Sequence, residues 1–256
     1  MRSSADAAAA RLDGLSAEEL ARTLELPRVE LYASIGSTLD AAHAIGASAP
    51  SGTLIIADEQ TAGRGRHGRR WSSPPGAGLW LTLIEHPTDA RALDVLALRC
   101  GLYAAEALDA LASAPISVKW PNDLYVAGRK LAGVLIETRW RGTAPDWVAI
   151  GFGLNVSAPA MEDAIALAPG TTRLGALARL VPALRRAASA TRHLSSDELS
   201  RWRARDVAEG REVLTPAAGS ALGITASGEL VVRRQDGVMS QHRTGTLTFA
   251  EPLACS

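Results

Sequence analysis

The chain has 256 residues, of which 47% are hydrophobic and 21% are charged, and its formal net charge is zero. This length allows one large domain, or a large and a small one. The zero net charge argues against a general nucleic-acid binder, which usually carries a basic field over a whole face. The lack of an apolar run of about 20 residues argues against a membrane span.

The two cysteines and the N-terminal segment indicate a cytoplasmic protein. Cys100 lies in an apolar helical run and is interpreted as a buried core residue, while Cys255 lies at the tail. Two such cysteines do not form a disulfide scaffold. The first fifteen residues are rich in alanine, but charged residues interrupt them, so they do not resemble a secretory signal. Residues 1–27 are predicted to form an N-terminal extension.

The first half of the chain predicts helices and strands in alternation. Ser16-Ala17-Glu18-Glu19 is a capping-box pattern that opens a short helix to about Leu26. Apolar residues at helical spacing predict one long helix over residues 89–111. Further elements are expected as strands over residues 29–32, 53–57 and 79–84 and as a helix over residues 36–45.

The second half predicts the rest of a sheet, then helices, then a small β domain. Strands are expected over 116–120, 124–126, 131–138, 147–151 and 154–156. Residues 159–205 are mostly helical, punctuated by Pro159, Pro169 and Pro182. Later strands are expected over 221–225, 229–234, 238–242 and 246–249, with Asp236-Gly237 as a hairpin signal. The predicted fold class is α+β, a mixed β-sheet covered by helices over residues 28–208 and a small β-barrel over residues 209–256.

A loop rich in arginine and glycine follows the strand predicted over residues 53–57. Residues 63–71 read GRGRHGRRW. Glycines let backbone amides approach a ligand closely, and arginines supply planar forks for carboxylate and phosphate. The pattern indicates a site for an anionic small molecule, and a solvated basic loop or an RNA contact stays open as the alternative. His67 alone is more typical of a solvated loop residue than of a catalyst.

Three other segments join polar residues or glycines to strand ends, where ligands commonly bind. They are Lys119-Trp120-Pro121-Asn122-Asp123, Lys130-Leu131-Ala132-Gly133 and Gly151-Phe152-Gly153-Leu154-Asn155. A lysine at the end of an apolar strand is costly to bury unless an anion meets it. The alternatives are a surface pair of Lys119 with Asp123, a turn capped by Asp123 and a β-bulge at Gly133.

Several common sites are excluded by their spacing. Gly151-Phe152-Gly153 lacks the third glycine and the long helix of a dinucleotide fingerprint, and no Walker A loop is present. No Gly-x-Ser-x-Gly elbow occurs, so a serine hydrolase is not expected. The five histidines are scattered and nothing has metal-ligand spacing, so no protein metal site is predicted.

Taken together, the four segments resemble the biotin–protein ligase family. The family signature reads GRGRRGR-x-W, KWPND, K-L/I-A-G-I/V-L-x-E and G-I/V-G-I/L-N-V, and this chain has GRGRHGRRW, KWPND, KLAGVLIE and GFGLNV in the same order. The resemblance extends from about Ile35 to Phe249. It implies a catalytic fold similar to class II aminoacyl-tRNA synthetases, with a small C-terminal barrel similar to Src-homology domains.

The resemblance also implies a two-step reaction. Biotin and Mg-ATP give biotinyl-5′-AMP and pyrophosphate, and the amine of one lysine on a biotin carboxyl carrier domain, such as that of acetyl-CoA carboxylase, then attacks the mixed anhydride. No enzyme nucleophile is needed. Biotin, ATP and Mg2+ are therefore expected as substrates and activator, with no tightly bound prosthetic group.

Site residues follow from the match to the family pattern. The biotin pocket would use Ser37, Thr38, Gln60, Gly63, Arg64, Arg66, Lys130, Gly133 and Gly151. The nucleotide side would use Arg66, Arg69, Trp71, Lys119, Asn122 and Asn155. Arg66 and Lys130 would contact the carboxylate and phosphate, and Asp123 would orient the incoming lysine or accept its proton. The Arg/Gly loop is expected to fold over biotin and shield the anhydride.

The chain departs from the family pattern at three places. Leu39 stands where asparagine is common, His67 replaces an arginine, and the C-terminal barrel is short between Glu212 and Ala221. Fewer than about 35 residues precede the catalytic body, so we expect a monofunctional ligase without DNA binding, as a monomer or homodimer. A lipoate–protein ligase or octanoyltransferase is the nearest alternative, and an RNA-binding module is a remote one.

Overall fold

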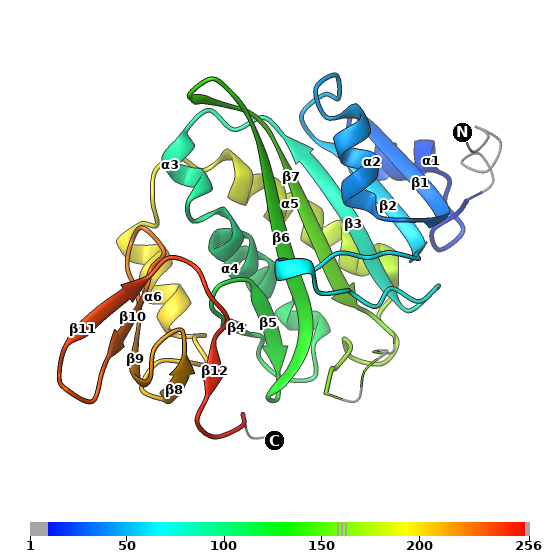
Figure 1. The fold of residues 1–256 in the computed structure, drawn as a ribbon. Coiled ribbons are helices and arrows are strands. Elements are labelled where there is room, and N and C mark those ends of the chain that lie inside the picture. The colour runs from blue at the N-terminus through cyan, green and yellow to red at the C-terminus, as the bar shows by residue number, and fades with distance from the viewer. Residues whose placement is uncertain (1–9, 158, 160, 162, 254–256) are drawn as a thin grey trace.

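Seven strands form the main sheet, which crosses the centre of Figure 1. The structure is a computed structural model that describes residues 10–157, 159, 161 and 163–253. In sheet order the strands are β1 (Arg28–Ile35), β2 (Thr53–Gln60), β3 (Gly78–Glu85), β7 (Ala144–Asn155), β6 (Arg129–Arg141), β5 (Asp123–Val126) and β4 (Ser117–Lys119). β1 and β2 run parallel and the other neighbours antiparallel, so the predicted mixed sheet is confirmed.

Helices cover both faces of this sheet (Figure 1). They are α1 (Ala17–Thr23), α2 (Thr38–Ile45), α3 (Ala90–Leu93), α4 (Leu96–Leu108), α5 (Arg173–Ser189) and α6 (Ser196–Arg203), with short 3-10 turns η1 (Arg66–Gly68) and η2 (Asp109–Leu111). The predicted capping box is present, because Ser16 Oγ accepts a hydrogen bond from the Glu19 amide at 3.3 Å and Glu19 accepts one from the Ser16 amide at 2.8 Å.

Strand β2 shows how the core divides between the two faces. Leu54 and Ile56 belong to the large apolar cluster that includes α4 and α5, whereas Ile55 belongs to a smaller cluster under α2. Successive side chains of a strand point to opposite faces. The continuous apolar run at residues 53–57 is therefore explained by burial on both sides.

The helix predicted over residues 89–111 is wrong as a single element. The chain breaks between α3 and α4, where Val95 has φ −115° and ψ 6° and is fully buried. The 3-10 turn η2 follows α4. The break places Val95 in the core without disturbing the apolar spacing on either side, so periodicity alone could not reveal it.

Two further expectations are corrected. The strands predicted over 147–151 and 154–156 are one strand, β7, so Gly151 and Gly153 lie inside a strand. Pro182 lies inside α5 and does not end a helix. A proline within a helix costs about 3 kcal/mol. Buried residues on both sides of it, including Val181 and Leu184, offset that cost by packing α5 against α4.

A second sheet follows α6 and confirms the expected small C-terminal β domain. Its strands are β8 (Glu212–Thr215), β9 (Gly219–Ile224), β10 (Leu230–Arg233), β11 (Met239–His242) and β12 (Thr248–Phe249). They pair antiparallel in the order β11-β10-β9-β8-β12. The predicted turn at Asp236-Gly237 joins β10 to β11, and Arg234 N donates to Val238 O at 2.9 Å. Strand β8 was not expected from the sequence.

None of the helices in the described part of the chain has the length and apolar character to cross a bilayer. The domain boundaries at residues 27/28 and 208/209 stay predictions. Residues 1–9 and Cys255 lie outside the described residues. Within residues 10–27, Leu12, Leu20 and Leu26 pack into the large core cluster.

Candidate active site

A cavity of about 320 Å³ lies between the Arg/Gly loop, strands β4 to β7 and residues 246–247 of the C-terminal domain. The structure brings most of the predicted site residues together here. Those that line the cavity are Ser37, Thr38, Gln60, Arg64, Arg66, Arg69, Trp71, Lys119, Asn122, Asp123, Lys130, Gly133 and Gly151. Residues more than 200 positions apart in the sequence thus form one site.

The cavity also has walls that the sequence analysis did not select. Gly153 and Gly151 both line the cavity from β7, two positions apart. Tyr125 and Asp123 do the same on β5. The period of two along a strand would have identified both. Thr246 and Leu247 come from the C-terminal domain, and no local sequence signal connects them with the site.

Gly63 and Asn155 were predicted as ligand contacts, but neither lines the cavity. A Cβ atom at Gly63 would lie 2.4 Å from the backbone oxygen of Trp71, so this glycine lets the two limbs of the loop approach each other. Asn155 is 6% exposed, and its Nδ2 donates to Ile165 O at 3.1 Å. Both residues therefore have a structural role that accounts for their identity.

One end of the cavity is a buried chain of neutral polar groups. The Thr38 amide and hydroxyl both donate to Gln60 Oε1, at 2.9 and 3.1 Å. Gln60 Nε2 donates to Ser73 Oγ at 2.9 Å, and Thr82 Oγ1 donates to Thr38 Oγ1 at 2.9 Å. Ser37 caps α2 by accepting from the Leu39 amide. These bonds fix the amide orientation of Gln60 and create a polar wall suited to a planar group with both donors and acceptors.

The floor of the cavity is flat because it is built from glycines on β6 and β7. Gly133 and Gly153 are directly paired in the sheet register. Cβ atoms there would lie 3.1 Å from Trp71 Cζ3 and 2.5 Å from Trp71 Nε1, respectively. A Cβ atom at Gly151 would lie 3.1 Å from Leu39 Cδ1. Larger residues on this floor would displace the indole of Trp71 or the side chain of Leu39.

Arg66 and Arg69 of the Arg/Gly loop reach different walls of the cavity. Arg66 Nη1 donates to Asn122 Oδ1 at 3.2 Å, and Arg69 Nη2 donates to Thr246 Oγ1 at 3.4 Å. The limbs are joined by a hydrogen bond from Trp71 N to Gly63 O at 2.9 Å. The loop, which follows β2, therefore contacts both the Lys119–Asp123 segment and the C-terminal domain.

Arg64 differs from the other loop arginines because carboxylates neutralise it. Arg64 Nη1 lies 3.1 Å from Glu137 Oε1 and Arg64 Nη2 lies 3.1 Å from Asp40 Oδ1. Glu137 also pairs with His43. We call Asp40, His43, Arg64 and Glu137 the Arg64 ion cluster. Its two carboxylates leave Arg64 with little charge to offer an anionic ligand.

The other end of the cavity is cationic. Burial lowers the pKa of Lys119, which Asp123 opposes, and burial also lowers the pKa of Arg66. Lys119 Nζ lies 5.3 and 5.2 Å from the ring centroids of Tyr125 and Phe249. Depressed pKa values of this kind mark cations that an anion would stabilise.

Lys130 and Asp123 form an ion pair with 2.8 Å between Nζ and Oδ1. Lys130 Nζ also lies 5.0 Å from the centroid of the Trp71 ring. Burial, followed by the charges of Asp123 and Asp163, raises the pKa of the Tyr125 hydroxyl, which stays neutral. Asp123 is therefore a carboxylate that lines the cavity together with Lys119 and Lys130.

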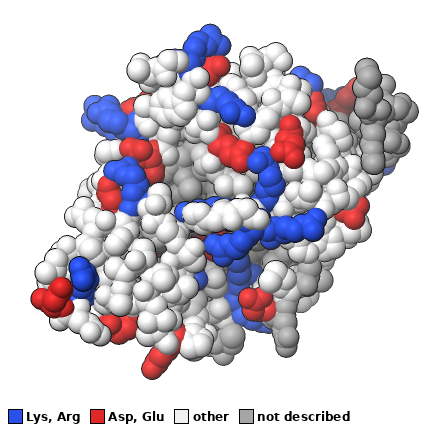
Figure 2. Space-filling view, viewed as in Figure 1, with Lys and Arg blue, Asp and Glu red and all other residues white. Residues whose placement is uncertain are grey.

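The arrangement suits a ligand with a polar planar head at one end and negative groups at the other. Figure 2 shows Lys and Arg side chains gathered across the middle of this face, over the position of η1 in Figure 1. Among the described residues, no group of three or more His, Cys, Asp or Glu side chains could hold a metal ion. Cys100 is buried in α4, where burial raises the pKa of its thiol, as expected for a core residue.

Comparisons with known proteins agree with this site. The profile of the biotin/lipoate A/B protein ligase family matches residues 33–155. The biotin–acetyl-CoA-carboxylase ligase of Mycobacterium tuberculosis is 35% identical over 185 residues, which cover 69% of this chain and 65% of that protein. The bifunctional ligase/repressor BirA of Escherichia coli is 40% identical over 116 residues, which cover 45% of this chain and 36% of BirA. The matched part thus spans less than two thirds of either relative.

Solved structures resemble the fold over most of the chain. A biotin protein ligase from Aquifex aeolicus in complex with biotin and ATP superposes with a TM-score of 0.70 at 24% identity, covering 87% of this chain and 98% of that one. A biotin protein ligase from Leishmania major in complex with biotinyl-5-AMP gives a TM-score of 0.59 at 24% identity, covering 84% and 98%. This likeness confirms the predicted α+β fold with its small C-terminal domain.

Proposed function

We propose that this chain is a biotin–protein ligase acting through biotinyl-5′-AMP, a proposal that begins from the match of residues 33–155 to the biotin/lipoate A/B protein ligase family. The observation that carries the proposal is the order in which three kinds of surface follow one another along one cavity. A neutral polar wall, a glycine floor and a cationic end follow one another. Biotin has a ureido ring, an apolar bicycle and chain, and a carboxylate in the same order.

The polar wall supports biotin over lipoate. A ureido group offers two N–H donors and one carbonyl acceptor, and the hydroxyls and amide of Ser37, Thr38 and Gln60 can meet them. A dithiolane ring has no such groups, so it would form no hydrogen bonds with this wall while displacing the water that otherwise solvates it. The lipoate–protein ligase or octanoyltransferase reading is the weaker alternative for this reason.

The first chemical step is attack of the biotin carboxylate on the α-phosphorus of ATP, with pyrophosphate as the leaving group. Both reactants are anionic, so the step needs charge neutralisation and alignment more than a protein nucleophile. We assign this task to Arg66 and Lys130, with Arg69 and Lys119 on the nucleotide side. ATP would enter as its Mg2+ complex, because Mg2+ binds substrate phosphates and keeps several waters.

The second step is attack of a lysine amine of the carrier domain on the anhydride carbonyl, which releases AMP. A lysine at neutral pH is mostly ammonium and must lose one proton before it attacks. We propose that Asp123 orients this ammonium or accepts its proton. The carboxylate of Asp123 is 20% exposed and contacts Lys130, so it is both accessible and held in place.

The Arg/Gly loop would cover the anhydride between the two steps. Its hydrogen bonds to Asn122 and Thr246 place it across the cavity, and Trp71 lies against the glycine floor. Water excluded from this space could not hydrolyse the adenylate. Trp71, Lys119 and Asn122 would line the nucleotide, and Arg64, Gly133 and Gly151 would line the biotin side.

The partner would be a biotin carboxyl carrier domain, in keeping with the name of the M. tuberculosis relative. The absence of DNA binding, a monomeric or homodimeric state and a cytoplasmic location stay predictions, as do the effects of Leu39 and His67.

The test is transfer of label. The purified chain with ATP, Mg2+ and radiolabelled biotin should catalyse biotin-dependent exchange between pyrophosphate and ATP and should label one lysine of a carrier domain. Replacing biotin by lipoate should abolish both signals. Transfer of lipoate without transfer of biotin would reverse the assignment. Binding of single-stranded RNA that weakens steeply with salt, without transfer of either acid, would indicate the RNA-binding alternative.

A further inference from the structure

A turn of the C-terminal domain, residues 225–228, is inserted against the catalytic domain. Gly228 has φ +87°, and a Cβ atom on it would lie 2.8 Å from Leu98 Cδ1 and 3.1 Å from Val95 Cγ1. Leu194 N donates to Ala226 O at 2.9 Å. The turn therefore rests directly on the start of α4, and only glycine fits at its closest point.

This turn also holds a residue of the candidate active site. Trp120 is 1% exposed, and its indole Nε1 donates to Gly228 O at 3.0 Å. Trp120 stands between Lys119 and the segment that carries Asn122 and Asp123. A buried tryptophan whose ring and N–H are both fixed transmits position to its backbone neighbours. The turn thus contacts the Lys119–Asp123 segment through the side chain of Trp120.

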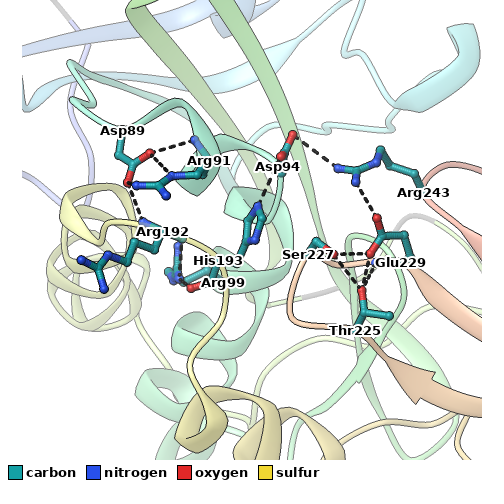
Figure 3. A network of polar contacts seen from close by, with 10 residues as sticks. All are labelled: Asp89, Arg91, Asp94, Arg99, Arg192, His193, Thr225, Ser227, Glu229 and Arg243. Carbon is teal, nitrogen blue, oxygen red and sulfur yellow. Dashed lines mark hydrogen bonds and ion pairs between the residues drawn. The ribbon is translucent and has the colours of Figure 1, made fainter.

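A polar network fastens the turn from outside (Figure 3). Glu229 accepts hydrogen bonds from Ser227 and Thr225 at the turn itself. These bonds lower the pKa of Glu229 to about 2, so its carboxylate is ionised at neutral pH. Arg243 Nη2 lies 2.5 Å from Glu229 Oε1, and Arg243 Nη1 lies 3.5 Å from Asp94 Oδ1.

The network ends on the catalytic domain. Asp94 is the last residue before Val95 at the break between α3 and α4, and its other oxygen lies 3.6 Å from His193 Nε2. In Figure 3, Arg243 lies between the Glu229 carboxylate and the Asp94 carboxylate and contacts both. It is therefore the cation that joins the two domains at this turn.

We propose that Arg243, through Glu229 and Asp94, is a positioning residue for the nucleotide side of the active site, acting by way of the turn and Trp120. The proposal rests on the proposed biotin ligase function. It concerns the affinity for ATP, since Lys119 and Asn122 belong to the nucleotide side. Ser37, Thr38 and Gln60 lie at the start of α2 and on β2, away from the turn, so biotin affinity would change less than ATP affinity.

Kinetics of biotin-dependent pyrophosphate exchange test this proposal. Arg243→Ala should raise KM for ATP by about fivefold, the effect of losing one partly exposed ion pair, and should leave KM for biotin within about twofold. Arg243→Lys should restore most of the ATP affinity. Arg234→Ala is the matched control, because Arg234 belongs to the same domain, is 52% exposed against 53% for Arg243, and pairs with Asp236 inside the domain.

Hydrogen exchange gives a readout that does not depend on activity. In Arg243→Ala, amides of residues 117–126 should exchange faster than in the wild-type chain, while those of β2 should not change. Equal behaviour of Arg243→Ala and Arg234→Ala in both measurements would overturn the proposal. So would a uniform rise of exchange with equal rises in both KM values, since this would indicate a merely structural role. Suppose that the wild-type chain showed no pyrophosphate exchange, while Arg243→Ala still raised amide exchange over residues 117–126. The proposed ligase function would then be wrong, but the positioning of the Lys119–Asp123 segment by Arg243 would be supported.

Discussion

Two groups of arginines in this molecule have opposite surroundings. Arg99 on α4 is 1% exposed and bonds Glu198 on α6 through Nε at 2.6 Å and Nη2 at 3.2 Å. Tyr103 completes the contact by donating to Glu198 at 3.0 Å. Arg66 and Arg69 of the Arg/Gly loop instead donate to neutral oxygens, those of an asparagine and a threonine.

This difference in hydrogen-bond partner separates structural arginines from arginines that can bind an anionic ligand. The Glu198 carboxylate neutralises the charge of Arg99, and the ion pair joins α4 to α6. A neutral oxygen orients Arg66 without neutralising it, and burial lowers the pKa of the Arg66 guanidinium more than the charge of Asp123 raises it. Residue type alone does not distinguish the two groups, because the partner decides the role. The predictions below test this contrast, from the largest expected effect to the smallest.

Removing the buried arginine should affect stability most. Arg99→Ala leaves the Glu198 carboxylate buried without its partner, and breaking such a pair costs about 3–5 kcal/mol. The free energy of unfolding, measured by urea denaturation, should fall by about this amount. A loss below about 1 kcal/mol would mean that Arg99 does not differ from a surface arginine in the way proposed.

Removing a loop arginine should affect chemistry and leave the fold intact. Arg66→Ala should slow adenylate formation by about 100-fold, because one fixed cation near the developing charge is worth that much. The adenylate that does form should leak more readily into solution. Single-turnover measurements with ATP and biotin would determine both quantities.

Arg141→Ala is the control for this variant, since Arg141 lies on the β6–β7 hairpin, is 79% exposed and pairs with Asp146. It should change neither rate nor stability. An Arg66→Ala variant that melts many degrees below the wild-type chain would show that Arg66 belongs to the structural group.

The contrast extends to buried carboxylates. Burial would raise the pKa of Glu198, but hydrogen bonds, first from Arg99, lower it to about 2. Among the described residues, no Lys, Arg or His side chain forms an ion pair with Asp206, and burial raises the pKa of Asp206 to about 6 despite the hydrogen bond from the Ala208 amide. A raised pKa adds stability that is fully present below the unfolded value of 3.8 and is lost as pH rises through about 6.

Wild-type protein should therefore lose about 2 kcal/mol of stability between pH 4 and pH 8 relative to Asp206→Asn, whose side chain does not titrate. Urea denaturation of both proteins across this range is the measurement. Parallel stability curves would show that Asp206 is ionised without penalty in the folded state.

Much of the architecture followed from the sequence. The apolar runs of β2 and β3, the capping box at Ser16 and the Asp236-Gly237 turn each carry a local signal, and each forms as predicted. The break at Val95 and the proline inside α5 had no such signal, because tertiary packing decides both. Strand β8 is four residues long and pairs with β9 and β12, so its pattern was too short to predict a strand from the sequence.

The candidate site was predictable where a motif lies on one strand end and unpredictable where it depends on a distant partner. Trp71 on the glycine floor and Lys119 against Phe249 are contacts between remote segments. The same applies to Arg64, which the sequence groups with the other loop arginines but which Glu137 neutralises. Whether an arginine meets a carboxylate is a property of the fold.

Arg64 is the case that tests the contrast most finely, because it lies in the ligand-binding loop but has the surroundings of a structural arginine. Glu137→Gln keeps the size of the side chain and removes its charge, so Arg64 would keep only the more exposed carboxylate of Asp40 as its partner. The first limb of the loop would be held less firmly beside Gln60. The pair is partly exposed, so the effect should be small, about a fivefold rise in KM for biotin with kcat nearly unchanged.

Asp40→Asn provides the matched control for Glu137→Gln. Asp40 contacts the same guanidinium, but it is 64% exposed whereas Glu137 is 27% exposed, so solvent screens it more strongly. Its variant should shift KM for biotin by less than about twofold. Limited proteolysis of the loop should follow the same order, with Glu137→Gln cleaved faster than Asp40→Asn. If both variants behaved like the wild-type chain, the ion cluster would not hold the loop, and pairing with a carboxylate would no longer suffice to mark an arginine as structural.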